Sequence, residues 1–371
     1  MPCETLVKHN VKGLMIKILT VLGARPQFIK ASVVSRAIQD NSNMDEKIIH
    51  TGQHYDTNMS SIFFDEMEIP KPDYQLKIKG DDHGSMTGNI MIDMEPIIKK
   101  EAPNAVIVYG DTNTTLAAAL VSKKLHLPLI HIEAGLRSYN MKMPEEINRI
   151  VTDRISDICF CPTQLAYDNL VKENYGEKLE LVGDVMYDAT LFYAELSEKR
   201  STIIKDNDLA ENEFVLCTVH RAENTDSKER LEEIFNAINH ITKDKKVVLP
   251  LHPRTQKMLK QFGIKTEALV IDPVGYFDMQ TLIKNCSVVM TDSGGLQKES
   301  YFYNKFCITL RDETEWVELV DNGYNFITGA NGKTIIFETE KAIGTKFESS
   351  DNLYGDGTSA QKIVNIIDKN I

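Results

Sequence analysis

Short apolar runs alternate with helical stretches along the chain, and this alternation limits the possible folds more than any other feature. The runs are short, rich in β-branched residues and apolar on both faces, which is typical of strands buried in a parallel sheet. The intervening segments, such as Asn113–Lys124 and Gly295–Tyr303, have helical periodicity. Because the pattern occurs twice, the sequence predicts an α/β protein with two doubly wound parallel-sheet domains.

The predicted strands are Ile16–Leu22, Lys47–Thr51, Ala105–Tyr109, Leu129–Ile132, Ile158–Cys161 and Leu179–Val182, then Phe214–Val219, Lys246–Leu251, Ala268–Ile271, Ser287–Met290, Phe306–Leu310 and Tyr324–Ile327. We expect the seam between the domains near Val182–Asp188. The first domain then spans residues 1–183 and the second spans residues 184–354, a division that suits a chain of 371 residues. The C-terminal helix, predicted within residues 355–371, is expected to join the first domain.

Composition excludes several classes of protein. The chain has 42 Lys and Arg against 54 Asp and Glu, a formal net charge of −12, which argues against nucleic-acid binding. No stretch reaches the roughly 20 apolar residues needed to cross a bilayer, and the first fifteen residues lack the apolar core of a signal peptide. The six cysteines lack zinc-ligand spacing, so we expect reduced thiols, no metal and a cytoplasmic location.

Neither the G-x-G-x-x-G fingerprint nor the P-loop pattern is present, so the main sequence evidence for binding of NAD or ATP is missing. No cofactor is expected. Ligands of open α/β sheets bind at the carboxyl ends of the strands. The polar residues that follow the predicted strands are therefore the candidates for a site.

Acidic residues follow strands of the first domain at three places. Asp111 could cap a helix, Glu145 could interact with the dipole of the helix that starts after Pro144, and Glu133 has no structural explanation at the edge of an apolar strand. Together the three carboxylates suit acid/base work on a sugar-like centre. The first turn, with Arg25 and then Lys30, is either a phosphate contact or a plain βα turn.

In the second domain, His220 and Arg221 leave one strand together, and His220 is either an ordinary histidine or a proton carrier. Another strand leads into Ser293-Gly294-Gly295 and then a helix, a sequence typical of a diphosphate cradle. Glu299 follows about one turn later, within reach of a ribose.

Taken together, these residues resemble the non-hydrolysing UDP-N-acetylglucosamine 2-epimerase family. The matching stretches are LTVLGARPQFIKAS, HTGQHYD, VYGDTNTTLAAAL, IHIEAGLRS, PEEINR, PTQLAYDNL, VGDVMYDA, TVHRAEN, LHPR, TDSGGLQKES and LRDETE, in family order. The resemblance implies a GT-B-like fold of two Rossmann-type domains facing across a cleft, a homodimer, a UDP-sugar substrate and no cofactor. It also implies that UDP is eliminated across C1–C2 to give a 2-acetamidoglucal and is then added back.

The resemblance assigns roles to matching positions. The implied catalytic residues are Asp111, Glu133, Glu145 and His220. The implied UDP-sugar contacts are Arg25, Lys30, His54, Arg137, Arg221, Asn224, Ser293, Gly294, Gly295 and Glu299. The expected reaction interconverts UDP-GlcNAc and UDP-ManNAc for surface polysaccharide synthesis.

Three segments depart from the family pattern: residues 80–88, 275–279 and 314–318, where T-E-W-V-E replaces the more usual T-E-R-P-E. These features resemble the branch that acts on UDP-2,3-diacetamido-2,3-dideoxyglucuronate, so that substrate is the alternative. A GT-B glycosyltransferase is a more remote alternative, because it would not need all of Asp111, Glu133 and Glu145 around the sugar.

Overall fold

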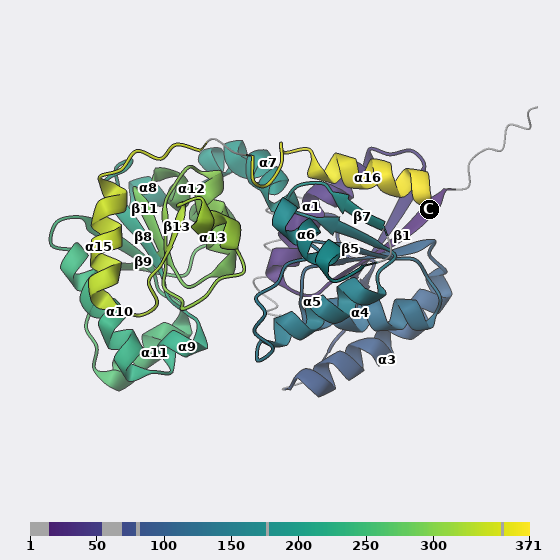
Figure 1. The fold of residues 1–371 in the computed structure, drawn as a ribbon, viewed down its shortest axis with the longest axis horizontal. Coiled ribbons are helices and arrows are strands. Elements are labelled where there is room, and N and C mark those ends of the chain that lie inside the picture. The colour runs from purple at the N-terminus through teal and green to yellow at the C-terminus, as the bar shows by residue number, and fades with distance from the viewer. Residues whose placement is uncertain (1–14, 54–68, 79–81, 176–177, 350–351) are drawn as a thin grey trace, which may run out of the picture.

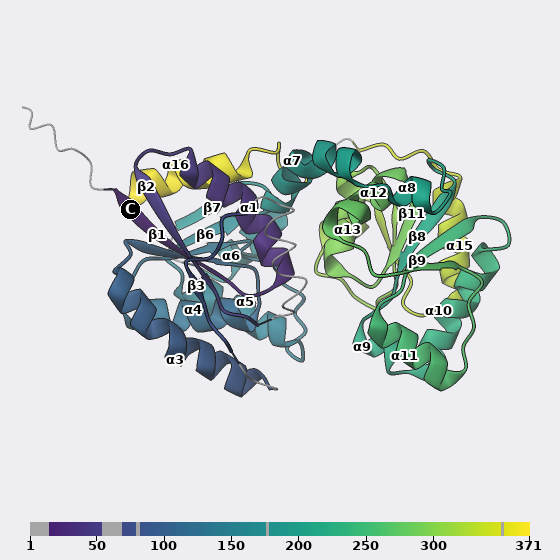
Figure 2. The same ribbon diagram turned by 180° about the vertical axis from the view of Figure 1, so that it is seen from behind.

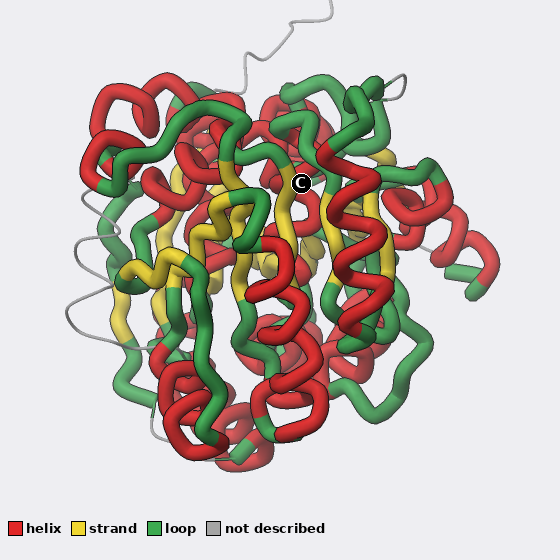
Figure 3. Tube along the Cα trace, turned by 90° about the vertical axis from the view of Figure 1, so that its left-hand side faces the viewer, coloured by secondary structure: helices red, strands yellow, loops and turns green. Residues whose placement is uncertain are grey.

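The computed structural model describes residues 15–53, 69–78, 82–175, 178–349 and 352–371. It contains two parallel sheets, each covered by helices, and Figure 1 shows the two halves of the chain side by side. Figure 3 looks onto the C-terminal half and shows its strands enclosed by helices. The predicted α/β class with two doubly wound domains is confirmed.

The first half contains β1 (Ile16–Leu22), α1 (Arg25–Gln39), β2 (Met44–His50), β3 (Tyr74–Gln75), α3 (His83–Glu101), β4 (Ala105–Tyr109), α4 (Asn113–Lys124), β5 (Leu129–Ile132), α5 (Pro144–Ile155), β6 (Ile158–Cys161), α6 (Gln164–Lys172) and β7 (Lys178–Leu181). Its strand order is β3-β2-β1-β4-β5-β6-β7. The chain reverses its direction of winding between β1 and β4, which are neighbours in the sheet.

The connecting helix α7 (Val185–Arg200) follows. The second half contains α8 (Ile203–Asp206), β8 (Phe214–Thr218), α9 (Ala222–Thr225), α10 (Lys228–Ile241), β9 (Lys246–Pro250), α11 (Pro253–Phe262), β10 (Leu269–Ile271), α12 (Tyr276–Asn285), β11 (Val288–Thr291), α13 (Gly294–Phe302), β12 (Cys307–Thr309), α14 (Val317–Asp321), β13 (Asn325–Ile327) and α15 (Gly332–Ile343), and the chain ends with α16 (Ser359–Asn370). The order β10-β9-β8-β11-β12-β13 repeats the same reversal between β8 and β11.

All twelve predicted strands form, with ends that differ by a few residues, but β3 was missed. The β3 strand has only two residues, both polar or half-exposed, at the edge of the sheet beside β2. Such a strand carries neither an apolar run nor an alternating pattern, and its pairing depends on tertiary contact.

Helix α7 connects the two halves and packs on both of them (Figure 2). Tyr193 of α7 has its ring centroid 5.9 Å from that of Tyr276 in α12, and Phe192 lies 4.5 Å below the guanidinium of Arg36 in α1. The N-cap of α7 is Asp184, within the predicted seam. The division of the chain at residues 183 and 184 stays a prediction.

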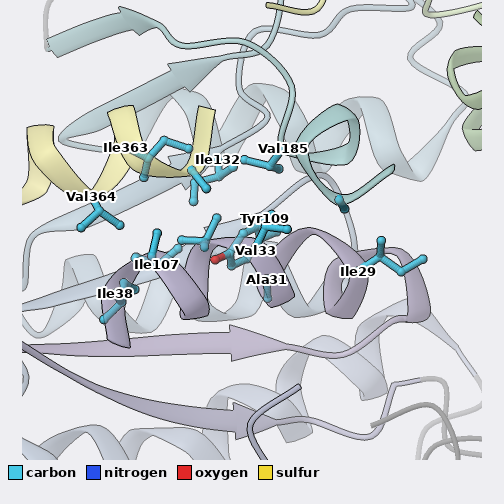
Figure 4. Packing of buried hydrophobic residues seen from close by; sticks show 14 of the residues in the cluster. Ile29, Ala31, Val33, Ile38, Ile107, Tyr109, Ile132, Val185, Ile363 and Val364 are labelled. Carbon is cyan, nitrogen blue, oxygen red and sulfur yellow. The ribbon is translucent and has the colours of Figure 1, made fainter. Parts of the chain in front are cut away.

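The last helix, α16, returns to the first half and covers α1 (Figure 4). Ile363, Val364 and Ile367 are fully buried in one cluster with Ile38 of α1 and Ile107 of β4. Amphipathic spacing in α16 therefore completes the core on one face of the first sheet. Among the described residues, no helix combines the length and the apolar character needed to cross a membrane.

We predict that Ile363→Ala lowers the free energy of unfolding by about 2–5 kcal/mol, because it leaves a cavity between α16 and the first sheet. Asn365→Ala, on the exposed side of the same helix, is the matched control and should change stability by no more than about 0.5 kcal/mol. Chemical denaturation measures both. Equal effects of the two substitutions would contradict the role of α16 in this core.

Candidate active site

A cavity of about 500 Å³ lies between the two halves, at the carboxyl ends of their strands. Its lining comes from Pro26, Ile29, Lys30, Asp111, Glu133, Leu136, Met143, Glu145, Arg149 and Met186 on one side and from His220, Arg221, Val274, Tyr276, Met279, Ser293, Gly294, Gly295, Leu296, Lys298, Glu299, Glu315 and Trp316 on the other. The turns after β1 and β4, and after β8 and β11, flank the two reversals of winding. Such reversals are where open α/β sheets bind ligands, and the volume suits a small organic molecule.

Asp111 follows β4 and directs its carboxylate to Arg149 of α5, with 2.7 Å between Oδ2 and Nη2. Thr112, not Asp111, caps α4 by accepting a hydrogen bond from the Thr115 amide. Asp111 is therefore not needed as the helix cap, and it lines the cavity beside Arg149. Burial raises the pKa of Asp111, Arg149 opposes that effect, and the charge of Glu133 adds to it.

Glu133 follows β5 and adopts a left-handed backbone conformation with a φ of 71°. Non-glycine residues rarely adopt this conformation, which costs of order 1–3 kcal/mol and is concentrated at functional sites. Its carboxylate pairs with Lys30 of α1 and with Lys298 of α13, whose Nζ lies 2.9 Å from Oε1. Burial alone would raise the pKa of Glu133, but the two ammonium groups outweigh it and lower the pKa to about 2.

A buried network lies behind these two carboxylates. His131 Nδ1 is 2.7 Å from Asp153 Oδ1, and His131 Nε2 is 2.8 Å from the carbonyl oxygen of Gly110, the residue before Asp111. Arg137 is buried and donates to Asp153 and to Glu173. Arg137 is not among the residues that line the cavity, and its contact with substrate stays a prediction.

His131, Asp153 and Cys159 lie close enough together to share a metal ion. Both ring nitrogens of His131, however, already face oxygen atoms, and the thiol of Cys159 bonds to the backbone oxygen of Asp153. We therefore interpret this group as a hydrogen-bonded support for the turn that carries Asp111.

Two adjacent glutamates at the start of α5 have different environments. Glu146 is buried and accepts hydrogen bonds from the backbone of Ser138 and from Arg149. Glu145 lines the cavity instead. Since Pro144 begins the helix, both carboxylates also lie in its first turn, where they interact favourably with its dipole.

His220 follows β8 and is held by Asp292, a fully buried residue that follows β11. The backbone amides of His220 and Arg221 both donate to the Asp292 carboxylate, and His220 Nδ1 lies 3.2 Å from Oδ1. Burial lowers the pKa of His220, and Asp292 opposes this effect. Asn224 is buried and donates to Asp292 and to the Leu310 carbonyl, so it supports this loop without lining the cavity.

Helix α13 begins at Gly294 with its N-terminus at the cavity. Ser293 is the N-cap, but its side chain makes no capping hydrogen bond. A Cβ on Gly294 would lie 2.4 Å from Glu315 Oε1, and Arg311 holds that carboxylate, so only glycine fits. A Cβ on Gly295 would meet nothing within 4 Å. Amides of the first turn with open space before them favour an anion.

The structure thus brings ten of the predicted residues to one cavity: Lys30, Asp111, Glu133, Glu145, His220, Arg221, Ser293, Gly294, Gly295 and Glu299. Arg25 opens α1, but its side chain lies outside the described parts of the structure, as does all of His54. Sequence reasoning missed Arg149, Asp292, Lys298, Glu315 and Trp316. Arg149 and Lys298 stand inside quoted motifs, but only tertiary contacts show that they pair with Asp111 and Glu133.

Comparison with known proteins agrees with this arrangement. Residues 36–368 match the profile of a family described as UDP-N-acetylglucosamine 2-epimerase. The chain is 51% identical to the UDP-2,3-diacetamido-2,3-dideoxy-D-glucuronate 2-epimerase of Pseudomonas aeruginosa, over 95% of this chain and 100% of that protein. It is 42% identical to the UDP-N-acetylglucosamine 2-epimerase of Methanocaldococcus jannaschii, over 95% of this chain and 99% of that protein.

Solved structures give the same result. The crystal structure of the Methanocaldococcus jannaschii UDP-GlcNAc 2-epimerase in complex with UDP-GlcNAc and UDP superposes with a TM-score of 0.88 at 41% identity, covering 96% of this chain and 100% of the other. The structure of the Neisseria meningitidis UDP-GlcNAc 2-epimerase bound to UDP-GlcNAc gives 0.85 at 31% identity, with the same coverage of both chains. The family predicted from the motifs is confirmed: the chain belongs to the UDP-N-acetylglucosamine 2-epimerase family of isomerases.

Proposed function

We propose that this protein is a UDP-N-acetyl-sugar 2-epimerase that eliminates UDP and adds it back. The observation that carries the proposal is the cavity itself, where Asp111, Glu133 and Glu145 come from one half and Ser293–Gly295 at the start of α13 comes from the other. One half thus offers groups for the sugar, and the other offers amides for a diphosphate.

In the first step a base removes the C2 proton, the C–H electron pair forms a C1–C2 double bond, and the C1–oxygen bond breaks so that its pair leaves with UDP. Addition of UDP to the glycal and protonation of C2 from the opposite face complete the inversion. Ionised Glu133 would stabilise positive character at C1, and the first-turn amides of α13 would stabilise the departing diphosphate.

Asp111 is better suited than Glu133 to exchange protons, because its pKa is raised whereas that of Glu133 is lowered to about 2. His220, whose pKa is lowered by burial, is neutral at physiological pH and able to accept a proton. Three carboxylates and a histidine around one sugar position also favour an epimerase over a glycosyltransferase.

The substrate that the sequence first suggested is UDP-GlcNAc. A second candidate, UDP-2,3-diacetamido-2,3-dideoxyglucuronate, is favoured by the 51% identity to the Pseudomonas aeruginosa protein and by Trp316 in the T-E-W-V-E segment. Trp316 is a cavity residue whose indole donates to the Gly294 carbonyl, so this departure lies beside the proposed diphosphate site. A homodimer and a cytoplasmic location are part of the same proposal.

Each candidate substrate should be incubated with the protein in D2O and followed by NMR. We expect a manno product with deuterium at C2 from at least one of them, because the proton returned to C2 comes from a group that exchanges with solvent. The relative rates identify the preferred substrate. Absence of both deuterium and manno product from the two substrates would contradict the proposed reaction.

Asp111→Asn and Glu133→Gln should each reduce turnover by roughly 100-fold or more, since each removes a charge or a proton carrier at the reacting carbons. UDP affinity measured by calorimetry should change little, because the diphosphate is bound from the other half. Asn365→Ala on α16 serves as the control for handling and folding. Loss of UDP binding with unchanged turnover of bound substrate would place these carboxylates in binding instead.

Gly295→Ala should separate folding from nucleotide binding. The added methyl group meets no neighbouring atom, and alanine in a helix gains up to about 1 kcal/mol over glycine, so the variant should be at least as stable as the wild type. The methyl group stands where a diphosphate would approach the amides, so UDP affinity should fall by about tenfold or more, a loss of roughly 1.4 kcal/mol. Unchanged UDP affinity would show that the nucleotide does not approach α13 at this residue.

A further inference from the structure

Lys298 of α13 is a buried lysine that sequence reasoning did not assign to any role. Only 2% of its surface is exposed. Its ammonium group lies 2.9 Å from Glu133 Oε1 and 2.5 Å from Asp184 Oδ2, and 4.1 Å from the ring centroid of Trp316. One cation therefore touches two carboxylates and an aromatic face at once.

The partners of Lys298 come from different parts of the fold. Glu133 follows β5 of the first sheet, and Asp184 is the N-cap of α7, the helix that packs on both halves. The other oxygen of Asp184 accepts a hydrogen bond from the Met186 amide, so this carboxylate is fixed by the start of α7. Lys298 thus joins the helix that begins at Ser293–Gly295 to the first sheet and to the connecting helix.

The charges around Glu133 make Lys298 hard to replace. Glu133 interacts with Lys30 of α1, with Asp111 after β4 and with Lys298, and these in turn interact with Arg149, Glu145 and Asp184. Without Lys298, one ammonium group would remain at Glu133, and among the described side chains no other cation is bonded to Asp184. A buried carboxylate that loses its partner shifts toward the protonated form.

We propose that Lys298 is a positioning residue for the reaction. Lys298 keeps Glu133 ionised through a contact made from α13. Glu133 is therefore an anion when the nucleotide-binding end of α13 lies at the cavity. Lys298 acts through Glu133 and does not touch the sugar. This inference rests on the proposed epimerase function.

If Lys298 only formed a structural ion pair, its removal would have a different effect. It would lower stability, and it would lower activity only in proportion to the fraction of unfolded protein. A positioning residue instead changes the pH dependence of turnover. Because Lys298 and Lys30 hold the pKa of Glu133 at about 2, the anion persists well below neutral pH. Removal of Lys298 raises that pKa, so activity should begin to fall at a higher pH.

The test measures kcat, KM and the pH profile of kcat/KM for Lys298→Met, Lys298→Arg and the double variant Lys298→Met with Asp184→Asn. In Lys298→Met the acidic limb that comes from protonation of Glu133, assigned by carbon-13 NMR of its carboxyl group, should move up by about 1–3 pH units, the range expected when one opposite charge is removed. Lys298→Arg should restore most of the wild-type limb, because it keeps the charge. Lys123→Met, which breaks an ion pair with Asp157 outside the cavity, is the matched control and should leave the profile unchanged.

The double variant separates stability from positioning. Removing the charge of Asp184 together with Lys298 leaves no carboxylate at position 184 that Lys298 had balanced, so thermal stability should recover. Glu133 still has only Lys30 beside it, so the limb should stay shifted. The proposal would be overturned if the acidic limb of the double variant returned to its wild-type position together with stability. It would also be overturned if the limb did not move in Lys298→Met.

Failure of the proposed function gives a separate result. If the wild type produces no epimer from either substrate, that function is contradicted, and the titration of Glu133 is then followed directly by carbon-13 NMR of labelled wild type and Lys298→Met. A higher pKa in the variant supports the positioning role, and identical titrations overturn it.

Discussion

The pairing of Glu133 with Lys30 and Lys298 is the interaction on which the cavity depends, because it places three charges where little water reaches them. Isolated charges are not tolerated in such an environment, so each must be matched by a partner at close range. The partners come from α1, from the turn after β5 and from α13. The requirement for charge balance therefore favours one arrangement of the two sheets around the cavity.

The same requirement divides the carboxylates into two kinds. Burial favours a raised pKa at both carboxyl groups. At Glu133 two ammonium groups outweigh burial and lower the pKa, whereas at Asp111 the single guanidinium of Arg149 does not and the pKa stays raised. Two acids whose environments push their pKa values apart can serve different steps of one reaction. The proposed elimination would need both properties, a fixed anion near C1 and a group able to exchange a proton at C2. Neighbouring loops of one sheet carry two carboxylates that differ in this way.

The sequence allowed the fold and the outline of the site to be predicted, because parallel strands carry long apolar runs and because residues after those strands meet at one edge. It did not reveal β3, whose two residues pair only through tertiary contact. Arg137 was predicted to contact the substrate from the family resemblance. In the structure it pairs with the buried Asp153 and the exposed Glu173, and its contact with substrate stays a prediction. Lys298 and Asp292 were missed for the converse reason: their partners are distant in sequence, and neither residue type alone indicates a site.

Because the net charge is −12, a diphosphate would have to be bound by a few nearby groups and not by the overall charge of the protein. Lys30, Arg149 and Lys298 line the cavity, but each is already bonded to a carboxylate. Among the described residues of the lining, Arg221 is the arginine whose guanidinium makes no ion pair, and it stands next to His220. Under the proposed function, and among the described side chains, a diphosphate would therefore be held by Arg221 together with the first-turn amides of α13, while the paired cations keep the carboxylates in place. Since amides and one unpaired guanidinium hold an anion less tightly than a cluster of unpaired cations, such a site would suit the proposed reaction, in which UDP leaves and returns within one turnover.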